Sequence, residues 1–198
     1  MITLDDLLEL GNHEIEMKIE TAIAYARRSR SKLGASSTRI MEEQEKIDND
    51  LELQIMGLED FFERRTWSYE MFKEVKSGED IESREVFNEV LEEIKTGEID
   101  ALVVIDVDRL TRGDATDRKL VLTALRDNAV VLIEESTGKL YNPFNEEDLR
   151  QLEMKALFSN MEYQTIVKRN TRGKRLGARK GNYVISTIPF GYTKNKST

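Results

Sequence analysis

The feature that most constrains the fold is an alternation of short apolar runs with longer segments of helical spacing. Four runs have the length of strands: Thr21–Ala26, Trp67–Val75, Ala101–Val107 and Ala129–Glu134. Helical segments follow the first three runs, beginning at Ser37 or Thr38 and spanning Arg84–Lys95 and Asp114–Asp127. Because parallel strands are joined by crossovers that usually contain a helix, this alternation predicts an α/β fold with a mostly parallel central sheet flanked by helices.

Two further segments flank this expected core domain of residues 21–144. Residues 1–20 form an acidic, helix-prone extension in which Leu4, Leu7, Leu8 and Leu10 can share one face, and no function is assigned to them. From Asn145 to Gly181 no proline or strand signal interrupts the chain, which predicts one long helix of roughly 30 residues. A helix of this length must pack partly on something outside a single small domain. Its apolar positions are Leu149, Leu152, Ala156, Leu157 and Met161.

The composition excludes several kinds of chemistry. Cysteine is absent, so disulfides, cysteine-ligated zinc and thiol catalysis are excluded, and the single His13 cannot build a histidine-rich metal site. A nucleophile must therefore be an oxygen or a lysine, and we expect neither a metal nor a cofactor. No run approaches the ~20 apolar residues that cross a bilayer, and the start MITLDDLLEL lacks the basic region of a signal peptide. We expect an intracellular protein.

Charge is distributed very unevenly along the chain. The net charge is −8, but no acidic residue follows Glu162. The first 164 residues hold 21 of the 30 basic residues against all 38 acidic ones, a net charge of −17, and the remainder carries +9. Such asymmetry predicts a basic arm that contacts a polyanion, with a solvated basic helix end as the alternative. The expected DNA contacts on the predicted helix are Lys168, Arg169, Arg172, Lys174, Arg175, Arg179 and Lys180.

Polar side chains follow three of the predicted strands. Arg27 and Ser29 come after the first strand, Glu74 and Arg84 lie at and beyond the end of the second, and Asp108, Arg109 and Arg112 come after the third. In a parallel sheet these groups converge on one edge, which brings a hydroxyl within reach of guanidinium groups and carboxylates. Because arginine binds phosphate oxygens through two hydrogen bonds and stays charged, this set is suited to phosphate chemistry without a metal.

At these residues the chain also resembles a known family. Tyr25-Ala26-Arg27-Arg28-Ser29 resembles the Tyr-x-Arg-x-Ser signature of the serine recombinases, the resolvase and invertase family. Asp108-Arg109-Leu110-Thr111-Arg112 is similar to that family's Asp-Arg-Leu-x-Arg block, and Lys76-Ser77-Gly78 with Arg84 resembles its Ser-Gly segment and downstream arginine. After the basic helix, Pro189-Phe190-Gly191-Tyr192 is similar to the entry into the DNA-binding region of the large serine integrases.

The resemblance implies a resolvase-like fold and a centre for site-specific DNA recombination. Ser29 would attack a backbone phosphate and leave a 5′-phosphoserine link and a free 3′ hydroxyl; because the covalent intermediate keeps the phosphodiester energy, rejoining needs no ATP. Asp108 would hold the arginines, and the group that accepts the serine proton stays open. Glu74 stands where short resolvases have aspartate, and Gln44 aligns with a glutamine on a family helix near the site. The residues expected to bind the scissile phosphate or the leaving group are Arg27, Arg84, Arg109 and Arg112.

The resemblance further implies a dimer that pairs into a tetramer across two attachment sites on double-stranded DNA. Such integrases are encoded by phages, mobile elements or bacteria and act in the bacterial cytoplasm at the nucleoid. Residues 182–198 would begin a truncated DNA-binding region, so we expect an N-terminal fragment that is inactive or weakly active alone. An alternative from another class is a non-enzymatic α/β regulatory or oligomerisation module with a recombinase-like fold, against which the intact arginine and serine set argues.

Overall fold

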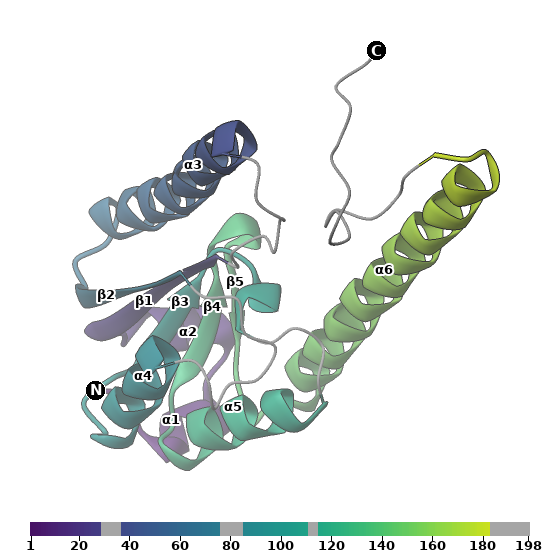
Figure 1. Ribbon diagram of the computed structural model, residues 1–198. Coiled ribbons are helices and arrows are strands. Elements are labelled where there is room, and N and C mark those ends of the chain that lie inside the picture. Colours follow the sequence, from purple (N-terminus) through teal and green to yellow (C-terminus); the bar gives the residue numbers. More distant parts are fainter. Residues whose placement is uncertain (29–36, 76–84, 111–114, 183–198) are drawn as a thin grey trace.

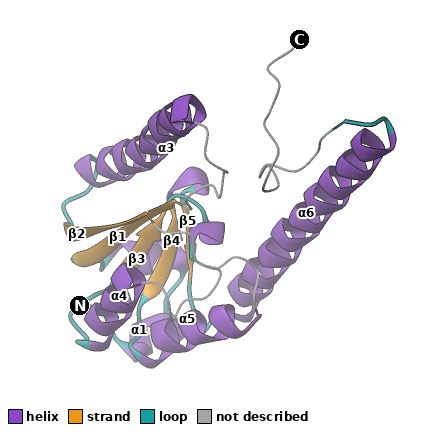
Figure 2. Ribbon diagram, in the orientation of Figure 1, coloured by secondary structure: helices purple, strands orange, loops and turns teal. Residues whose placement is uncertain are grey.

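A computed structural model describes residues 1–28, 37–75, 85–110 and 115–182, with side chains for 1–27, 50–74, 85–108, 110 and 119–182. Its centre is a five-stranded sheet of order β2-β1-β3-β4-β5 (Figures 1 and 2). The first four strands in this order pair in parallel, and β5 pairs antiparallel to β4. The predicted mostly parallel α/β fold is therefore confirmed. The strands are β1 (Thr21–Arg28), β2 (Ser68–Val75), β3 (Ala101–Val104), β4 (Val131–Glu134) and β5 (Lys139–Tyr141).

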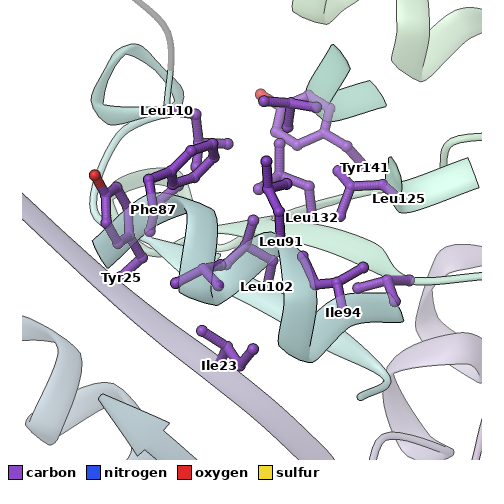
Figure 3. Close-up of a cluster of buried hydrophobic side chains, with 14 of the residues drawn as sticks. Ile23, Tyr25, Phe87, Leu91, Ile94, Leu102, Leu110, Leu125, Leu132 and Tyr141 are labelled. Atoms are coloured by element: carbon purple, nitrogen blue, oxygen red, sulfur yellow. The ribbon is translucent and has the colours of Figure 1, made fainter. Parts of the chain in front are cut away.

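Helices cover both faces of the sheet, because alternate residues of each strand are apolar on both sides. Ile23 and Tyr25 of β1 pack with Phe87 of α4 (Glu85–Lys95) and Leu125 of α5 (Ala115–Asp127), the cluster drawn in Figure 3. The intervening alanines of β1 pack on the opposite face, where their small side chains admit the bulkier residues of α3 (Ser37–Glu63). The α3 residues buried there are Leu58, Phe61 and Phe62.

Residues 1–20 help to cover the same face of the sheet as α3. They contain α1 (Leu4–Glu9) and α2 (Asn12–Met17), whose Leu7 and Ile15 are buried against the sheet. Of the expected leucine face, only Leu7 is fully buried, while Leu4 and Leu8 are exposed. The acidic extension expected from composition thus contributes apolar side chains to the core.

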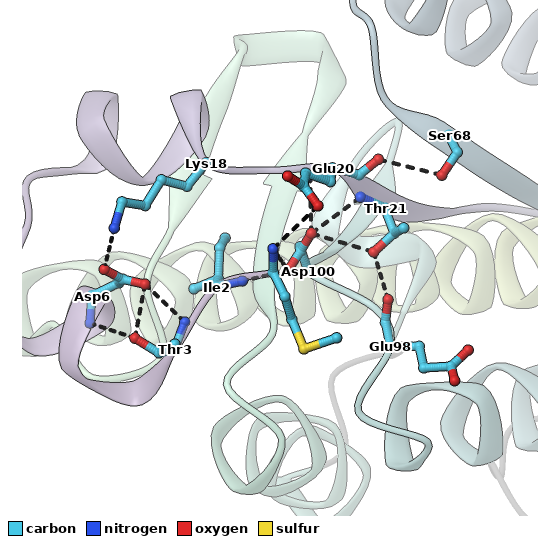
Figure 4. Close-up of polar contacts among 10 residues, drawn as sticks. Ile2, Thr3, Asp6, Lys18, Glu20, Thr21, Ser68, Glu98 and Asp100 are labelled. Atoms are coloured by element: carbon cyan, nitrogen blue, oxygen red, sulfur yellow. Dashed lines mark hydrogen bonds and ion pairs between the residues drawn. The ribbon is translucent and has the colours of Figure 1, made fainter.

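A buried carboxylate ties the same segment to the sheet. Asp100, which lies just before β3, accepts backbone N–H groups from Ile2 at 2.6 Å, Glu20 at 2.9 Å and Thr21 at 3.1 Å (Figure 4). Its side chain is only 1% exposed, so these bonds are shielded from water. Asp100 therefore fastens the chain start beside the first residue of β1.

β1 extends to Arg28, past the predicted end at Ala26, so Arg27 lies within the strand and not after it. β3, β4 and β5 also differ from the sequence expectation. β3 ends at Val104 and not at Val107, because Ile105 O accepts from Ser136 N and the chain then turns into the 3-10 helix η2 (Val107–Arg109). β4 begins only at Val131, because Ala129 has φ 55° in the turn after α5. The short β5 was not predicted; it returns antiparallel after η3 (Glu135–Thr137) through Gly138, whose φ of 65° suits glycine.

The predicted long helix is confirmed as α6 (Glu146–Arg179). Asn145 caps its start, where the Asn145 side-chain oxygen accepts from Glu147 N at 2.9 Å and Asp148 N at 3.2 Å. Leu152 packs into the core, but from Met161 onward nearly every described residue is exposed. The helix projects away from the sheet, as Figure 1 shows.

Candidate active site

The carboxyl ends of β1, β2 and β3 lie at one edge of the sheet. In the parallel pairing of β1 with β2, Arg27 is the Cα partner of Glu74, and on the other side of β1 Tyr25 is the partner of Val104. Paired residues of parallel strands point to the same face. Arg27 and Glu74 are therefore brought together by register, as the sequence predicted for neighbouring strand ends.

Both of these charged side chains are buried, Arg27 to 5% and Glu74 to 1% exposure. The Tyr25 hydroxyl donates a hydrogen bond to Glu74 Oε2, and the Tyr25 ring packs on Phe87 with centroids 5.0 Å apart. Burial of a charge is costly unless it is paired and hydrogen-bonded. Tyr25 and Phe87 thus pack beside Glu74, and the tyrosine hydroxyl supplies one polar contact to its carboxylate.

The third strand contributes through η2, which carries Asp108 and Arg109. Asp108 is exposed, whereas Leu110, two residues further along the chain, is only 2% exposed and packs in the cluster of Tyr25 and Phe87 (Figure 3). The backbone closes this turn through Leu110 N to Val107 O at 3.1 Å. Leu110 therefore anchors η2 on the core beside the end of β1, and η2 contacts both β1 and α6.

Sequence reasoning missed a buried carboxylate that contacts η2. Glu134, the last residue of β4, is fully buried and accepts Val107 N at 3.1 Å on Oε1 and Thr137 Oγ1 at 2.8 Å on Oε2. Lys155 of α6 donates to both oxygens, and the Tyr141 hydroxyl lies 3.3 Å from Oε2. The available signal was a glutamate that ends an otherwise apolar strand; its partner 21 residues later is visible only in the tertiary structure.

This environment shifts two ionisation equilibria. Burial alone would raise the pKa of Glu134, but hydrogen bonds from Lys155, Val107 N and Thr137 outweigh it and hold the pKa below its ordinary value. Burial, followed by the nearby charge of Glu134, raises the pKa of Tyr141 to about 12. Glu134 is thus held as a carboxylate next to a neutral phenol.

Several predicted site residues lie outside the described part of the chain. They are Ser29, Arg84 and Arg112, together with the segment Pro189–Tyr192. Gln44 lies in α3 and Arg109 in η2, but their side chains are outside the described residues. Of the predicted set, the structure therefore places Arg27, Glu74 and Asp108 at one sheet edge.

The predicted DNA contacts all lie on the projecting half of α6 or at its end. Lys168, Arg169, Arg172, Lys174, Arg175, Arg179 and Lys180 are exposed, the last as the residue that ends the helix. Among the described residues, no three or more histidine, aspartate or glutamate side chains group as metal ligands would. Nor does any helix in the described ranges have the length and apolar character needed to cross a membrane.

The order of the sheet, its polar edge and the long helix that follows define a resolvase-like α/β catalytic domain. The model of the family described as the resolvase N-terminal domain matches residues 22–183, and the chain belongs to this family of serine recombinase catalytic domains.

Solved structures that resemble this chain include recombinases from several sources. The N-terminal catalytic domain of TP901-1 integrase is 16% identical, with a TM-score of 0.49 and coverage of 74% of this chain and 98% of that one. A resolvase family site-specific recombinase from Streptococcus pneumoniae is 21% identical, with a TM-score of 0.48 and coverage of 81% and 99%. A serine recombinase from Sulfolobus solfataricus is 19% identical, with a TM-score of 0.44 and coverage of 83% and 89%.

Proposed function

We propose that this chain is the catalytic part of a site-specific DNA recombinase of the large serine integrase type, with Ser29 as nucleophile. The observation that carries the proposal is the placement of Arg27, Glu74 and the Asp108 segment at the carboxyl ends of three neighbouring parallel strands. Ser29 follows the last residue of β1 directly in the chain. Membership of the resolvase family supports the same reading.

In the proposed reaction the Ser29 hydroxyl gives up its proton to a general base, and its oxygen attacks the phosphorus of a backbone phosphodiester. The bond from phosphorus to the 3′ oxygen breaks, the 3′ oxygen takes up a proton, and a 5′-phosphoserine remains. Rejoining is the reverse attack by a 3′ hydroxyl, so the bond energy is conserved. Asp108 and Glu74 would hold the arginines in place, with Gln44 nearby on α3. The arginines that would meet the charge on the phosphate oxygens are Arg27, Arg84, Arg109 and Arg112.

The long helix supports a proposal for assembly and DNA contact. Two rows run along one face of α6 at intervals of seven residues, close to two helical turns. Each row begins with an apolar residue near the sheet and ends with two basic residues near the far end. We assign the apolar half to a second copy of the chain and the basic half to double-stranded DNA. The rows are Met154, Met161, Lys168 and Arg175, and Phe158, Thr165, Arg172 and Arg179.

In this proposal two dimers pair into a tetramer that holds two attachment sites. Residues 21–144 are the catalytic unit, 145–181 the helix for dimerisation and DNA contact, and 182–198 the start of a DNA-binding region. The acidic body, with its net charge of −17 over the first 164 residues, repels DNA, so the basic end of α6 is needed to bring the phosphate to Ser29.

The nucleophile is tested by trapping covalent protein–DNA adducts. The complete gene product is incubated with a pool of randomised duplexes, and DNA attached to denatured protein is recovered and sequenced. Wild type and Ser68→Ala, a control at the opposite end of the sheet, should both form adducts linked through a 5′ phosphate. Ser29→Ala should form none. Adducts that persist in Ser29→Ala refute the nucleophile; their absence from wild type favours the non-enzymatic module.

The dimer is tested with two matched substitutions on α6. Phe158 and Tyr163 are equally exposed, at 60% and 59%, but their spacing places them on opposite sides of the helix. Phe158→Glu should raise the dimer dissociation constant by at least about tenfold, whereas Tyr163→Glu should leave it unchanged. Light scattering over a concentration series measures both, and a strictly monomeric wild type refutes the assignment.

A further inference from the structure

A single buried carboxylate joins the long helix to the segment that carries Asp108. Glu134 Oε1 accepts the backbone N–H of Val107, the first residue of η2, at 3.1 Å. Lys155 of α6 donates to both oxygens of the same carboxylate. Thr137 and Tyr141 contact only Oε2. Glu134 therefore bridges two elements that are far apart in the sequence, and both belong to the proposed machinery.

The two partners depend on each other through the charge of Glu134. The Glu134 side chain is 0% exposed, and a buried carboxylate without a cation is strongly destabilised. Loss of the Lys155 ammonium would force Glu134 to take up a proton or to turn toward solvent. Either change weakens it as an acceptor for Val107 N, because hydrogen bonds to a charged acceptor are the stronger ones. A movement of α6 that withdraws Lys155 has the same effect.

We propose that Glu134 and Lys155 are positioning residues that hold Val107–Arg109 in place and make the placement of Asp108 and Arg109 depend on the orientation of α6. The proposal rests on the proposed recombinase function for its consequence in cleavage. The mechanical link between α6 and η2 does not require that function, so the two are tested separately. α6 and η2 also contact each other directly, so a change in the orientation of α6 can affect the position of η2.

The chain offers a matched control in a second ion pair of similar exposure at the start of α6. Lys139 of β5 and Asp148 of α6 lie 3.3 Å apart, and their side chains are 30% and 6% exposed, against 38% and 0% for Lys155 and Glu134. Asp148, in the first turn of α6, accepts Asn142 N just after β5 at 3.0 Å and the side-chain amide of Asn12 in α2 at 3.1 Å. This pair fastens the base of α6 without a bond to η2.

The first measurement is hydrogen exchange of the Val107 amide by NMR, relative to the core amide of Leu102. In Lys155→Met, exchange at Val107 should accelerate by about ten- to hundredfold, the loss expected for a hydrogen bond to a charged acceptor. Lys155→Arg should restore protection, and Lys139→Met should leave the ratio at its wild-type value. Glu134→Gln, which keeps the side-chain shape, should act in the same direction as Lys155→Met. Unchanged exchange in Lys155→Met, or equal acceleration in Lys139→Met, overturns the link.

The second measurement is the rate of covalent adduct formation with the duplexes recovered above. Lys155→Met should lower the rate at saturating DNA by about tenfold or more while the half-saturating DNA concentration stays constant, because positioning acts on the reacting groups. Lys139→Met should cleave at the wild-type rate. If wild type forms no adduct, the proposed function fails and the exchange experiment alone decides the link. If Lys155→Met cleaves as fast as wild type, the positioning role is refuted.

Discussion

The Tyr25 hydroxyl donates a hydrogen bond to the Glu74 carboxylate across the pairing of β1 and β2, and both side chains are buried. Tyr25 is two residues before Arg27, and Arg27 is the register partner of Glu74. This hydrogen bond therefore helps to position the carboxylate beside the arginine. Glutamate, longer than aspartate by one methylene, reaches back to this phenol from the end of β2.

Removal of this hydroxyl should lower stability. Tyr25→Phe keeps the packing on Phe87 but withdraws a donor from a buried carboxylate, so the free energy of unfolding should fall by about 1–3 kcal/mol. Urea unfolding followed by circular dichroism measures the change. Tyr69→Phe, at a 42% exposed position of β2, should stay within about 0.5 kcal/mol of wild type. Equal effects of the two substitutions would contradict the role of the Tyr25 hydroxyl.

Asp100 should be needed to fasten the chain start. Asp100→Asn replaces one of two accepting oxygens with an NH2 donor, which then faces either the backbone N–H of Ile2 or those of Glu20 and Thr21. The loss should be about 2–4 kcal/mol, with early proteolytic cleavage before residue 20. Thermal unfolding and limited proteolysis are the measurements. Asp127→Asn, an exposed control, should change neither, and an intact N-terminal segment in Asp100→Asn would argue against this fastening.

Acid should weaken the fold partly through Glu134. Its pKa is lower in the folded chain than its ordinary value near 4.5, so its contribution to stability is present above that value and is lost as the pH falls through the folded pKa. Glu134→Gln should therefore flatten the loss of stability below about pH 4.5, although it lowers stability at pH 7. Urea unfolding at a series of pH values tests this. Exposed Glu153→Gln should keep the wild-type slope; an unchanged slope in Glu134→Gln would count against the assignment.

Gly57 should be restricted to small residues. A Cβ built there would lie 3.1 Å from Ile105 Cδ1, where α3 crosses the end of β3. Gly57→Val should lose about 1–3 kcal/mol through overpacking. In Gly57→Ala, a gain of about 1 kcal/mol in helix propensity offsets a contact that the Ile105 tip can relieve. Thermal unfolding compares them, and the double substitution Gly57→Val with Ile105→Ala should recover part of the loss. Equal stability of Gly57→Val and wild type would rule out the tight contact.

Much of the fold was predictable because its signals are local. The apolar runs at Thr21–Ala26 and Ala101–Val107 mark buried strands, and the segment after Asn145 marks the long helix. The early end of β3, by contrast, was decided by groups distant in the sequence. β3 stops early because Ser136 and Glu134 take the backbone bonds of Ile105 and Val107. Residues 1–20 were predicted to be an acidic extension, but several of their apolar side chains pack in the core.

The sequence by itself determined the strand and helix periodicity, the acidic body with its basic helix, and the polar residues at or beyond the ends of three strands. These depend on residue type and spacing alone. Only the tertiary structure decided that Arg27 faces Glu74, that Tyr25 bonds this carboxylate, and that Glu134 joins Lys155 to Val107. The physical reason is that register and side-chain contact between separated segments come from packing of the whole core, which no local pattern encodes.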